Sequence, residues 1–138
     1  IIWGNVLRTD QTIFPKNYKV VANLPYQITS PVLKLFLEDL ENKPKEMTLM
    51  VQKEVARRIC AKPGEMSVLA LAVQYFSHPE IVGEVKNNNF WPVPQVDSAI
   101  LKITPFKHIT TNAEDQAFFK FAKIGFAQKR KLLIKMTK

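Results

Sequence analysis

Four consecutive residues, Asn23-Leu24-Pro25-Tyr26, could act on an aromatic amine. The Asn23 carboxamide and the backbone carbonyl of Leu24, beside a proline that stiffens the chain, can together accept both hydrogens of an aromatic amino group. The Tyr26 ring can stack on the base that carries this amine. A simple turn with a packed tyrosine explains the same residues, and on these residues alone both interpretations stay open.

Other catalytic or metal-binding patterns are scarce. His78 and His108 are far apart, and neither has a cysteine, an aspartate or a second histidine at metal-ligand spacing. The lone Cys60 falls on the apolar face of an expected helix, which favours packing over a nucleophilic role. The four glycines form no phosphate-binding or dinucleotide-binding loop. We therefore expect no metal, and hydrolase and metalloenzyme functions are poorly supported.

The segments that would position the Asn23–Tyr26 loop alternate between strands and helices. Short apolar runs predict strands, apolar residues at helical spacing predict helices, and Ser30-Pro31 predicts a helix cap and first helical residue. We expect strands at 1–3, 18–22, 47–51, 81–85 and 99–104, and helices at 31–41, 52–60, 67–76 and from 113. This order predicts an α/β fold whose mostly parallel sheet has an antiparallel pair at its edge. The loop would then lie beyond the carboxyl end of a strand, where such sheets bind ligands.

Charge is distributed unevenly along the chain. The net charge is +8, yet the first 119 residues hold thirteen basic and twelve acidic residues, whereas the stretch from Lys120 onward holds seven basic residues and no acid. Such a cluster is typical of a surface that binds nucleic acid, although a solvated basic tail is an equally simple interpretation. With one cysteine and no long apolar run, we expect a cytoplasmic protein that does not enter membranes. The apolar start and the end inside a helical pattern suggest a piece of a longer protein.

Four ordered motifs give the sequence a family resemblance. N-L-P-Y after a strand resembles the fourth motif of S-adenosylmethionine-dependent amino-methyltransferases, and the longer run at 20–31, VVANLPYQITSP, resembles the ribosomal RNA adenine dimethyltransferases that act on the small subunit. Three further runs are similar to segments of the same family, namely MVQKEVARR at 50–58, FWPVPQVDSA at 90–99 and FAQKRKL at 126–132. Together they extend over essentially the whole chain.

The resemblance implies a domain organisation and a cofactor. Residues 1–106 would be the C-terminal part of a Rossmann-like class I methyltransferase domain, and residues 107–138 the start of a small helical RNA-binding domain. The family's glycine-rich cofactor motif would lie upstream, so we expect the chain alone to be inactive. Asn5 stands where the family has an aspartate that accepts a hydrogen bond from the cofactor's adenine, and the amide keeps the acceptor without its charge. Asn5 and Asn23 are the implied contacts to S-adenosylmethionine.

The implied reaction is N6,N6-dimethylation of adenosines in small-subunit ribosomal RNA, a step of ribosome biogenesis. Asn23, Leu24, Pro25 and Tyr26 would form the catalytic loop, which accepts the exocyclic amine and aims its lone pair at the methyl group. Tyr26 would stack on one face of the base, and Phe90, carried by the proline-rich loop, on the other. No metal and no strong base are implied.

The resemblance also implies partners. Lys129, Arg130 and Lys131 would contact phosphates of ribosomal RNA or of a small-subunit precursor, positioning the RNA without reading its sequence. We expect a monomer. Asp97 could serve the edge of the pocket or cap its loop, and we favour the cap.

Two alternatives remain. A large-subunit adenine methyltransferase of the erythromycin-resistance type uses the same chemistry, but more often carries isoleucine where this chain has Leu24. A non-catalytic RNA-binding factor on the same fold is the alternative from a different class, and the intact Asn23–Tyr26 loop argues against it.

Overall fold

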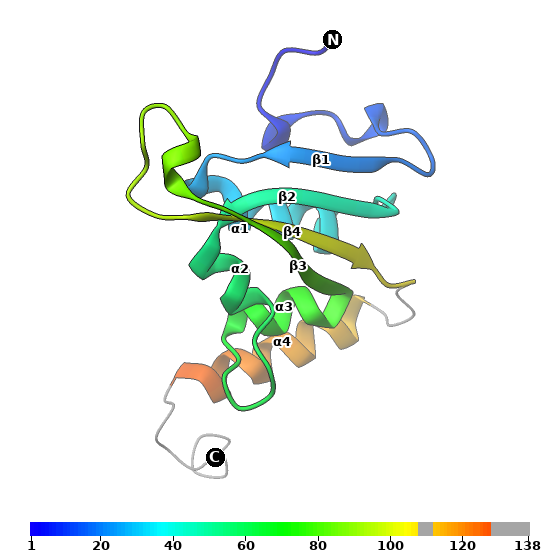
Figure 1. Ribbon diagram of the computed structural model, residues 1–138. Helices are drawn as coiled ribbons and strands as arrows, with labels where there is room; N and C mark the ends of the chain where they lie inside the picture. The colour runs from blue at the N-terminus through cyan, green and yellow to red at the C-terminus, as the bar shows by residue number, and fades with distance from the viewer. Residues whose placement is uncertain (108–111, 128–138) are drawn as a thin grey trace.

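The computed structural model describes residues 1–107 and 112–127. Within these residues the chain forms a sheet of four strands in the order β1-β2-β4-β3 (Figure 1). The strands are β1 (Lys19–Asn23), β2 (Glu46–Gln52), β3 (Ser77–Val85) and β4 (Ser98–Pro105). β1 pairs parallel with β2, whereas β4 pairs antiparallel with both β2 and β3, so β4 alone runs against the other three. The predicted α/β sheet with an antiparallel pair at its edge is confirmed.

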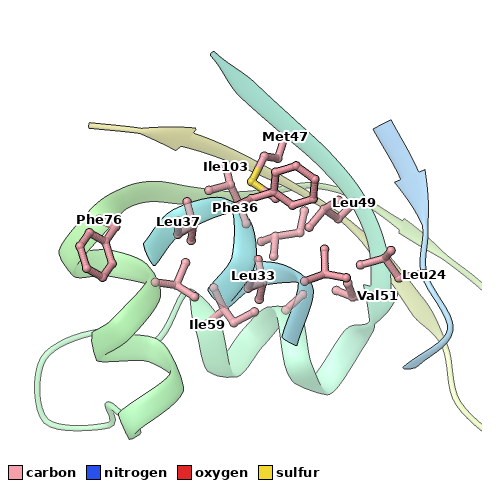
Figure 2. Close-up of a cluster of buried hydrophobic side chains, with 14 of the residues drawn as sticks. Leu24, Leu33, Phe36, Leu37, Met47, Leu49, Val51, Ile59, Phe76 and Ile103 are labelled. Atoms are coloured by element: carbon pink, nitrogen blue, oxygen red, sulfur yellow. The ribbon is translucent and has the colours of Figure 1, made fainter. Parts of the chain in front are cut away.

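Helices cover the apolar face of this sheet. They are α1 (Thr29–Lys34), which continues into the π-helical turn η4 (Leu35–Asp39), then α2 (Lys53–Ile59) and α3 (Val68–Phe76), while α4 (Asn112–Ala127) packs on α3. Leu33, Phe36 and Leu37 of the first helical segment are buried against alternate residues of the sheet such as Leu49 and Ile103 (Figure 2). The alternation of buried and half-buried residues along β2 is what a strand with one covered face requires.

Two local expectations are wrong. Residues 1–3 form no strand, and Ile1 and Trp3 are exposed, because no neighbouring segment of the described chain pairs with their backbone groups. Ser30 does not cap a helix, since α1 begins one residue earlier, at Thr29, with Ile28 at the cap position. Pro31 is still tolerated in the first turn, where backbone N–H groups have no helical partner.

The two outer edges of the sheet differ. On β3, Ile81 pairs with Leu101 and Gly83 with Ile100, so Val82 is an extra residue that forms a bulge. β1 has a regular register with β2 over its whole length, and Val21 on it is 81% exposed. The pairing of one edge strand is therefore interrupted by a bulge, and that of the other is regular.

Aromatic rings attach α4 to α3. The Tyr75 and Phe118 rings stack with centroids 4.4 Å apart, and Phe119 packs against Phe76 at 5.6 Å. The Tyr75 hydroxyl also donates to Asp115 Oδ1 at 3.0 Å. The division into domains at 106/107 stays a prediction. Among the described helices none is long and apolar enough to cross a membrane.

The core predicts a large effect for one truncation. Leu33 is 1% exposed, so Leu33→Ala leaves a cavity between α1 and the sheet. We expect the free energy of unfolding, measured by urea denaturation, to fall by about 2–5 kcal/mol. The matched control is Val21→Thr on the exposed face of β1, which should stay within about 0.5 kcal/mol of the parent. Equal losses in the two variants would contradict this assignment of the core.

Candidate functional site

The Asn23–Tyr26 loop begins where β1 ends. The Leu24 amide donates to the Met50 carbonyl at 3.4 Å, which continues the parallel pairing one residue past the strand. The Leu24 side chain is buried in the core, and Pro25 has an extended backbone with φ −55° and ψ 131°. The Ile28 amide then donates to the Pro25 carbonyl at 3.1 Å and starts a turn. The loop is thus held at both ends while Asn23 stays exposed.

The loop forms one wall of a pocket of about 440 Å³. All four predicted loop residues line it, and Phe90 lines it from the proline-rich segment, so the structure brings these five together. Six residues to which the sequence analysis gave no role in the pocket also line it, namely Gln27, Met50, Trp91, Pro92, Pro94 and Ser98. The lining residues include no carboxylate, lysine, arginine or histidine. The pocket therefore offers uncharged polar groups and aromatic rings.

A hydrogen bond fixes the orientation of the Tyr26 ring. Its hydroxyl lies 3.1 Å from Ser98 Oγ, and either oxygen can donate. Ser98 is 1% exposed and opens β4, next to the last residue of β2, Gln52. The Tyr26 hydroxyl is thus already hydrogen-bonded within the protein, and the face of the ring is what remains for stacking on a base. The D-S-A stretch of the proline-rich motif could have drawn attention to Ser98. Nothing in the sequence showed that its partner would be Tyr26.

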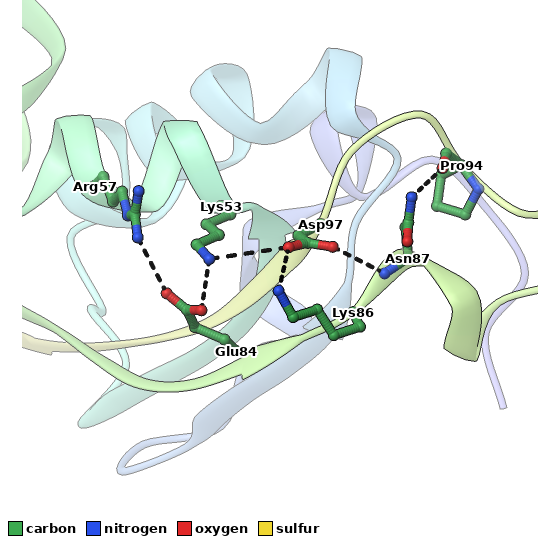
Figure 3. Close-up of polar contacts among 7 residues, drawn as sticks. All are labelled: Lys53, Arg57, Glu84, Lys86, Asn87, Pro94 and Asp97. Carbon is green, nitrogen blue, oxygen red and sulfur yellow. Dashed lines mark hydrogen bonds and ion pairs between the residues drawn. The ribbon is translucent and has the colours of Figure 1, made fainter.

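Asp97 holds the loop that carries Phe90. Its Oδ1 accepts from the Asn87 amide at 3.1 Å, and its Oδ2 lies 3.1 Å from Lys86 Nζ (Figure 3). The Asn87 side chain donates across the loop to the Pro94 carbonyl at 3.2 Å. The pKa of the Asp97 carboxyl is lowered, mainly by the hydrogen bond from the Asn87 amide and next by the hydrogen bond from Lys86. The preference for a capping role of Asp97 is confirmed.

Lys53 joins this loop to the start of α2. Its amide donates to the Asp97 carbonyl at 3.0 Å, and its ammonium lies 2.6 Å from Glu84 Oε2 and 3.9 Å from Asp97 Oδ2 (Figure 3). Arg57 reaches the other Glu84 oxygen at 3.5 Å. The hydrogen bond from Lys53 is the main reason why the pKa of Glu84 is lowered. The sequence analysis singled out the segment containing Lys53 and Arg57, but did not predict this positioning role.

Other predicted residues lie apart from the pocket or outside the described chain. Asn5 caps the turn η1 (Val6–Arg8), where its Oδ1 accepts from the Leu7 amide at 3.0 Å, and it does not line the pocket. The structure therefore does not bring Asn5 and Asn23 together in this cavity. Lys129–Lys131 fall in residues 128–138, outside the described residues. Burial raises the pKa of the Cys60 thiol, in keeping with a packed side chain.

The fold and the pocket together are those of part of a Rossmann-like α/β domain, in which an Asn-Leu-Pro-Tyr loop follows a parallel strand and lines a pocket. The chain belongs to the ribosomal RNA adenine dimethylase family, whose sequence model matches residues 5–138.

Named relatives agree with this family. The chain is 45% identical to a ribosomal RNA small subunit methyltransferase A of Dehalococcoides mccartyi, covering 97% of this chain and 47% of that protein. It is 42% identical to the Enterococcus faecalis protein of the same name, covering 96% and 46%. The chain thus spans about half the length of the curated relatives it matches.

Solved structures show the same fold. A dimethyladenosine transferase from Plasmodium falciparum superposes with a TM-score of 0.82 at 33% identity, covering 96% of this chain and 47% of that one. The 23S rRNA methyltransferase ErmE superposes with a TM-score of 0.76 at 24% identity, covering 96% and 53%, which is a likeness of fold.

The Asp97 contacts predict different effects for two substitutions. Asp97→Ala removes the acceptor of the Asn87 amide, so hydrogen exchange of that amide, followed by NMR, should become markedly faster. Asp97→Asn keeps a side-chain oxygen at this position and should preserve most of the protection. If both variants exchange like the parent, Asp97 does not hold the loop.

The same contacts predict a pH dependence. The pKa of Asp97 is lowered below its ordinary 3.8 in the folded chain. The contribution of the carboxylate is therefore complete above that ordinary value and is lost as the pH falls through the lowered one. A protonated carboxyl keeps an acceptor oxygen, as asparagine does, so protection of the Asn87 amide in the parent should decline only partly, and only in that acidic range.

Proposed function

We propose that this chain carries the adenosine-binding part of an S-adenosylmethionine-dependent dimethyltransferase for small-subunit ribosomal RNA. The observation that carries the proposal is the convergence of Asn23, Tyr26 and Phe90 on one uncharged pocket, in a chain of the rRNA adenine dimethylase family. The relatives it matches at 42–45% identity are named for the small subunit, which favours this substrate over the large subunit. The activity, the RNA and the small-subunit precursor as partner are all part of the proposal.

The pocket suits a flipped-out adenine. The Asn23 carboxamide and the Leu24 carbonyl accept hydrogen bonds from the N6 amine, which holds the nitrogen lone pair out of conjugation with the ring. Tyr26, fixed by Ser98, stacks on one face of the base, and Phe90 stacks on the other. Positioning and electrostatics therefore supply the catalysis, since the described lining offers no carboxylate or histidine as a base. The second methylation requires the same contacts to admit an amine that already carries one methyl group.

The chain also has residues that fit S-adenosylmethionine. This cofactor supplies an electrophilic methyl group on a sulfonium. Asn23 lies exposed at the carboxyl end of β1, where the aimed amine would meet that methyl group. Asn5 Oδ1 accepts one backbone hydrogen bond, and a carbonyl oxygen can accept a second one from an adenine amine. The turn that Asn5 caps also contacts α1, the helix that follows the catalytic loop.

Asn23 is tested in a chimaera in which this chain replaces the matching segment of the Enterococcus faecalis relative. Asn23→Ala should reduce dimethylation of 16S-type rRNA, detected by primer extension, about 100-fold or more, as for other positioned polar groups. RNA affinity should change little, because phosphate contacts dominate it. The matched control is Asn88→Ala, which makes the same truncation at an exposed residue that does not line the pocket.

Two outcomes would contradict the proposal. Undiminished methylation by the Asn23→Ala chimaera would remove the catalytic role of the loop. A folded parent chimaera that binds rRNA without methylating it would favour a non-catalytic RNA-binding factor.

The basic run is tested by the salt dependence of RNA binding. Changing Lys129, Arg130 and Lys131 together to glutamate removes up to three phosphate contacts. The slope of log affinity against log salt should then fall in magnitude by about 2, since each single-strand contact contributes about 0.7. A control variant reverses the exposed lysines Lys16, Lys45 and Lys62. Equal slopes in the two variants would assign the run to a solvated tail.

A further inference from the structure

Three aromatic rings line the pocket, but one base has only two faces. Tyr26 and Phe90 account for both faces of the target adenine in the proposed function, which leaves Trp91 without an assigned partner. The Trp91 side chain is 94% exposed, although tryptophan is normally among the more buried residues. Because Trp91 also lines the pocket, its exposed ring is accessible to a ligand bound there.

We propose that Trp91 stacks on a nucleobase next to the target adenosine, so that the protein holds two unpaired nucleotides rather than one. This inference rests on the proposed function. It makes Trp91 a substrate-positioning residue, which selects RNA whose neighbouring base is also free to leave its stack. Such stacking tolerates any base, because every base has a π face.

Hydrogen bonds and prolines hold the backbone of the loop that carries Trp91. The Phe90 amide donates to the Asn87 carbonyl at 3.2 Å, directly before Trp91. Pro92 and Pro94 follow with fixed φ, and the Asn87 side chain closes the loop onto the Pro94 carbonyl. Asp97 then ties the far end to the Asn87 amide. Because this backbone is already ordered, a base that stacks on Trp91 orders only the side chain and not the loop.

A nucleobase fits this surface better than a protein partner does. Val93 and Val96 are the other exposed large apolar residues of the loop. Together with Trp91 they offer well under the roughly 800 Å² that each partner buries in a typical specific protein interface. One stacked base requires only the face of one ring. Because Trp91 lines the same pocket as Tyr26 and Phe90, the RNA that delivers the adenine necessarily brings its neighbouring nucleotide close.

Trp91 can serve as its own reporter. The chain has two tryptophans, so Trp3→Phe leaves Trp91 as the sole indole. The probe is a short oligouridylate with one central adenosine, titrated while tryptophan fluorescence is recorded. We expect quenching that survives when the adenosine is replaced by an abasic nucleotide and weakens when a flanking uridine is replaced instead. Loss of quenching only with the abasic target would show that Trp91 stacks on the adenine itself and would overturn the inference.

Variants separate stacking from other effects. Trp91→Ala should weaken binding of this RNA about 10-fold, and Trp91→Phe should restore part of the loss. The control Val93→Ala, 56% exposed on the same loop, should bind like the parent. Equal weakening by Val93→Ala and Trp91→Ala would instead indicate a general apolar surface and reject the base-stacking role.

Kinetics in the Enterococcus faecalis chimaera distinguish failure of this inference from failure of the proposed function. Trp91→Ala should raise KM for rRNA about 10-fold with little change in kcat, because the target base keeps its own contacts. Unchanged KM with an active chimaera would overturn the role of Trp91 alone. A parent chimaera without methyltransferase activity would count against the proposed function, and with it against this inference.

Discussion

The pocket depends on one hydrogen bond, between the hydroxyls of Tyr26 and Ser98, which joins positions 72 residues apart. It can form because β4 runs antiparallel to β2. Asn23 at the end of β1 pairs with Met50, and Ser98 at the start of β4 pairs with Gln52, so both flank the same end of β2. If β4 ran parallel to β2, its last residue would lie beside Gln52, and the proline-rich loop that precedes β4 would lie at the opposite end of the strands. The direction of this one strand therefore decides whether the two halves of the pocket meet.

The sequence predicted which residues line the pocket better than it predicted which residues hold them in place. The Asn23–Tyr26 loop and Phe90 were identified from residue types and motif resemblance, and the structure places them in one pocket. The positioning roles of Ser98 and Lys53 were not predicted. They depend on partners that are distant in the sequence, and neither periodicity nor composition reveals such pairs. Trp91 was quoted within a motif but was given no role, since exposure is a property of the folded chain.

The errors have a local cause. An apolar triplet such as 1–3 resembles a buried strand, but a strand also needs a neighbour for its backbone groups, and sequence alone does not supply one. The start of α1 was predicted two residues too late, at Pro31 instead of Thr29, because Ser30-Pro31 is a good capping pair in isolation. In the structure the 3-10 turn Tyr26–Ile28 runs directly into α1, so the helix begins before Ser30. Local sequence propensity thus indicated where helices and strands could form, and the neighbouring segments of the fold decided which of them formed and where they begin.

The bulge at Val82 has a consequence for the assembly of this sheet. Adding a strand requires a straight row of backbone donors and acceptors, and the extra residue breaks that row on the outer side of β3. On the other side, β1 keeps a regular backbone through all of its pairing with β2. The two edges therefore differ in how readily they can pair with another strand. The edge of β1 has the regular backbone that such pairing requires, and the edge of β3 does not.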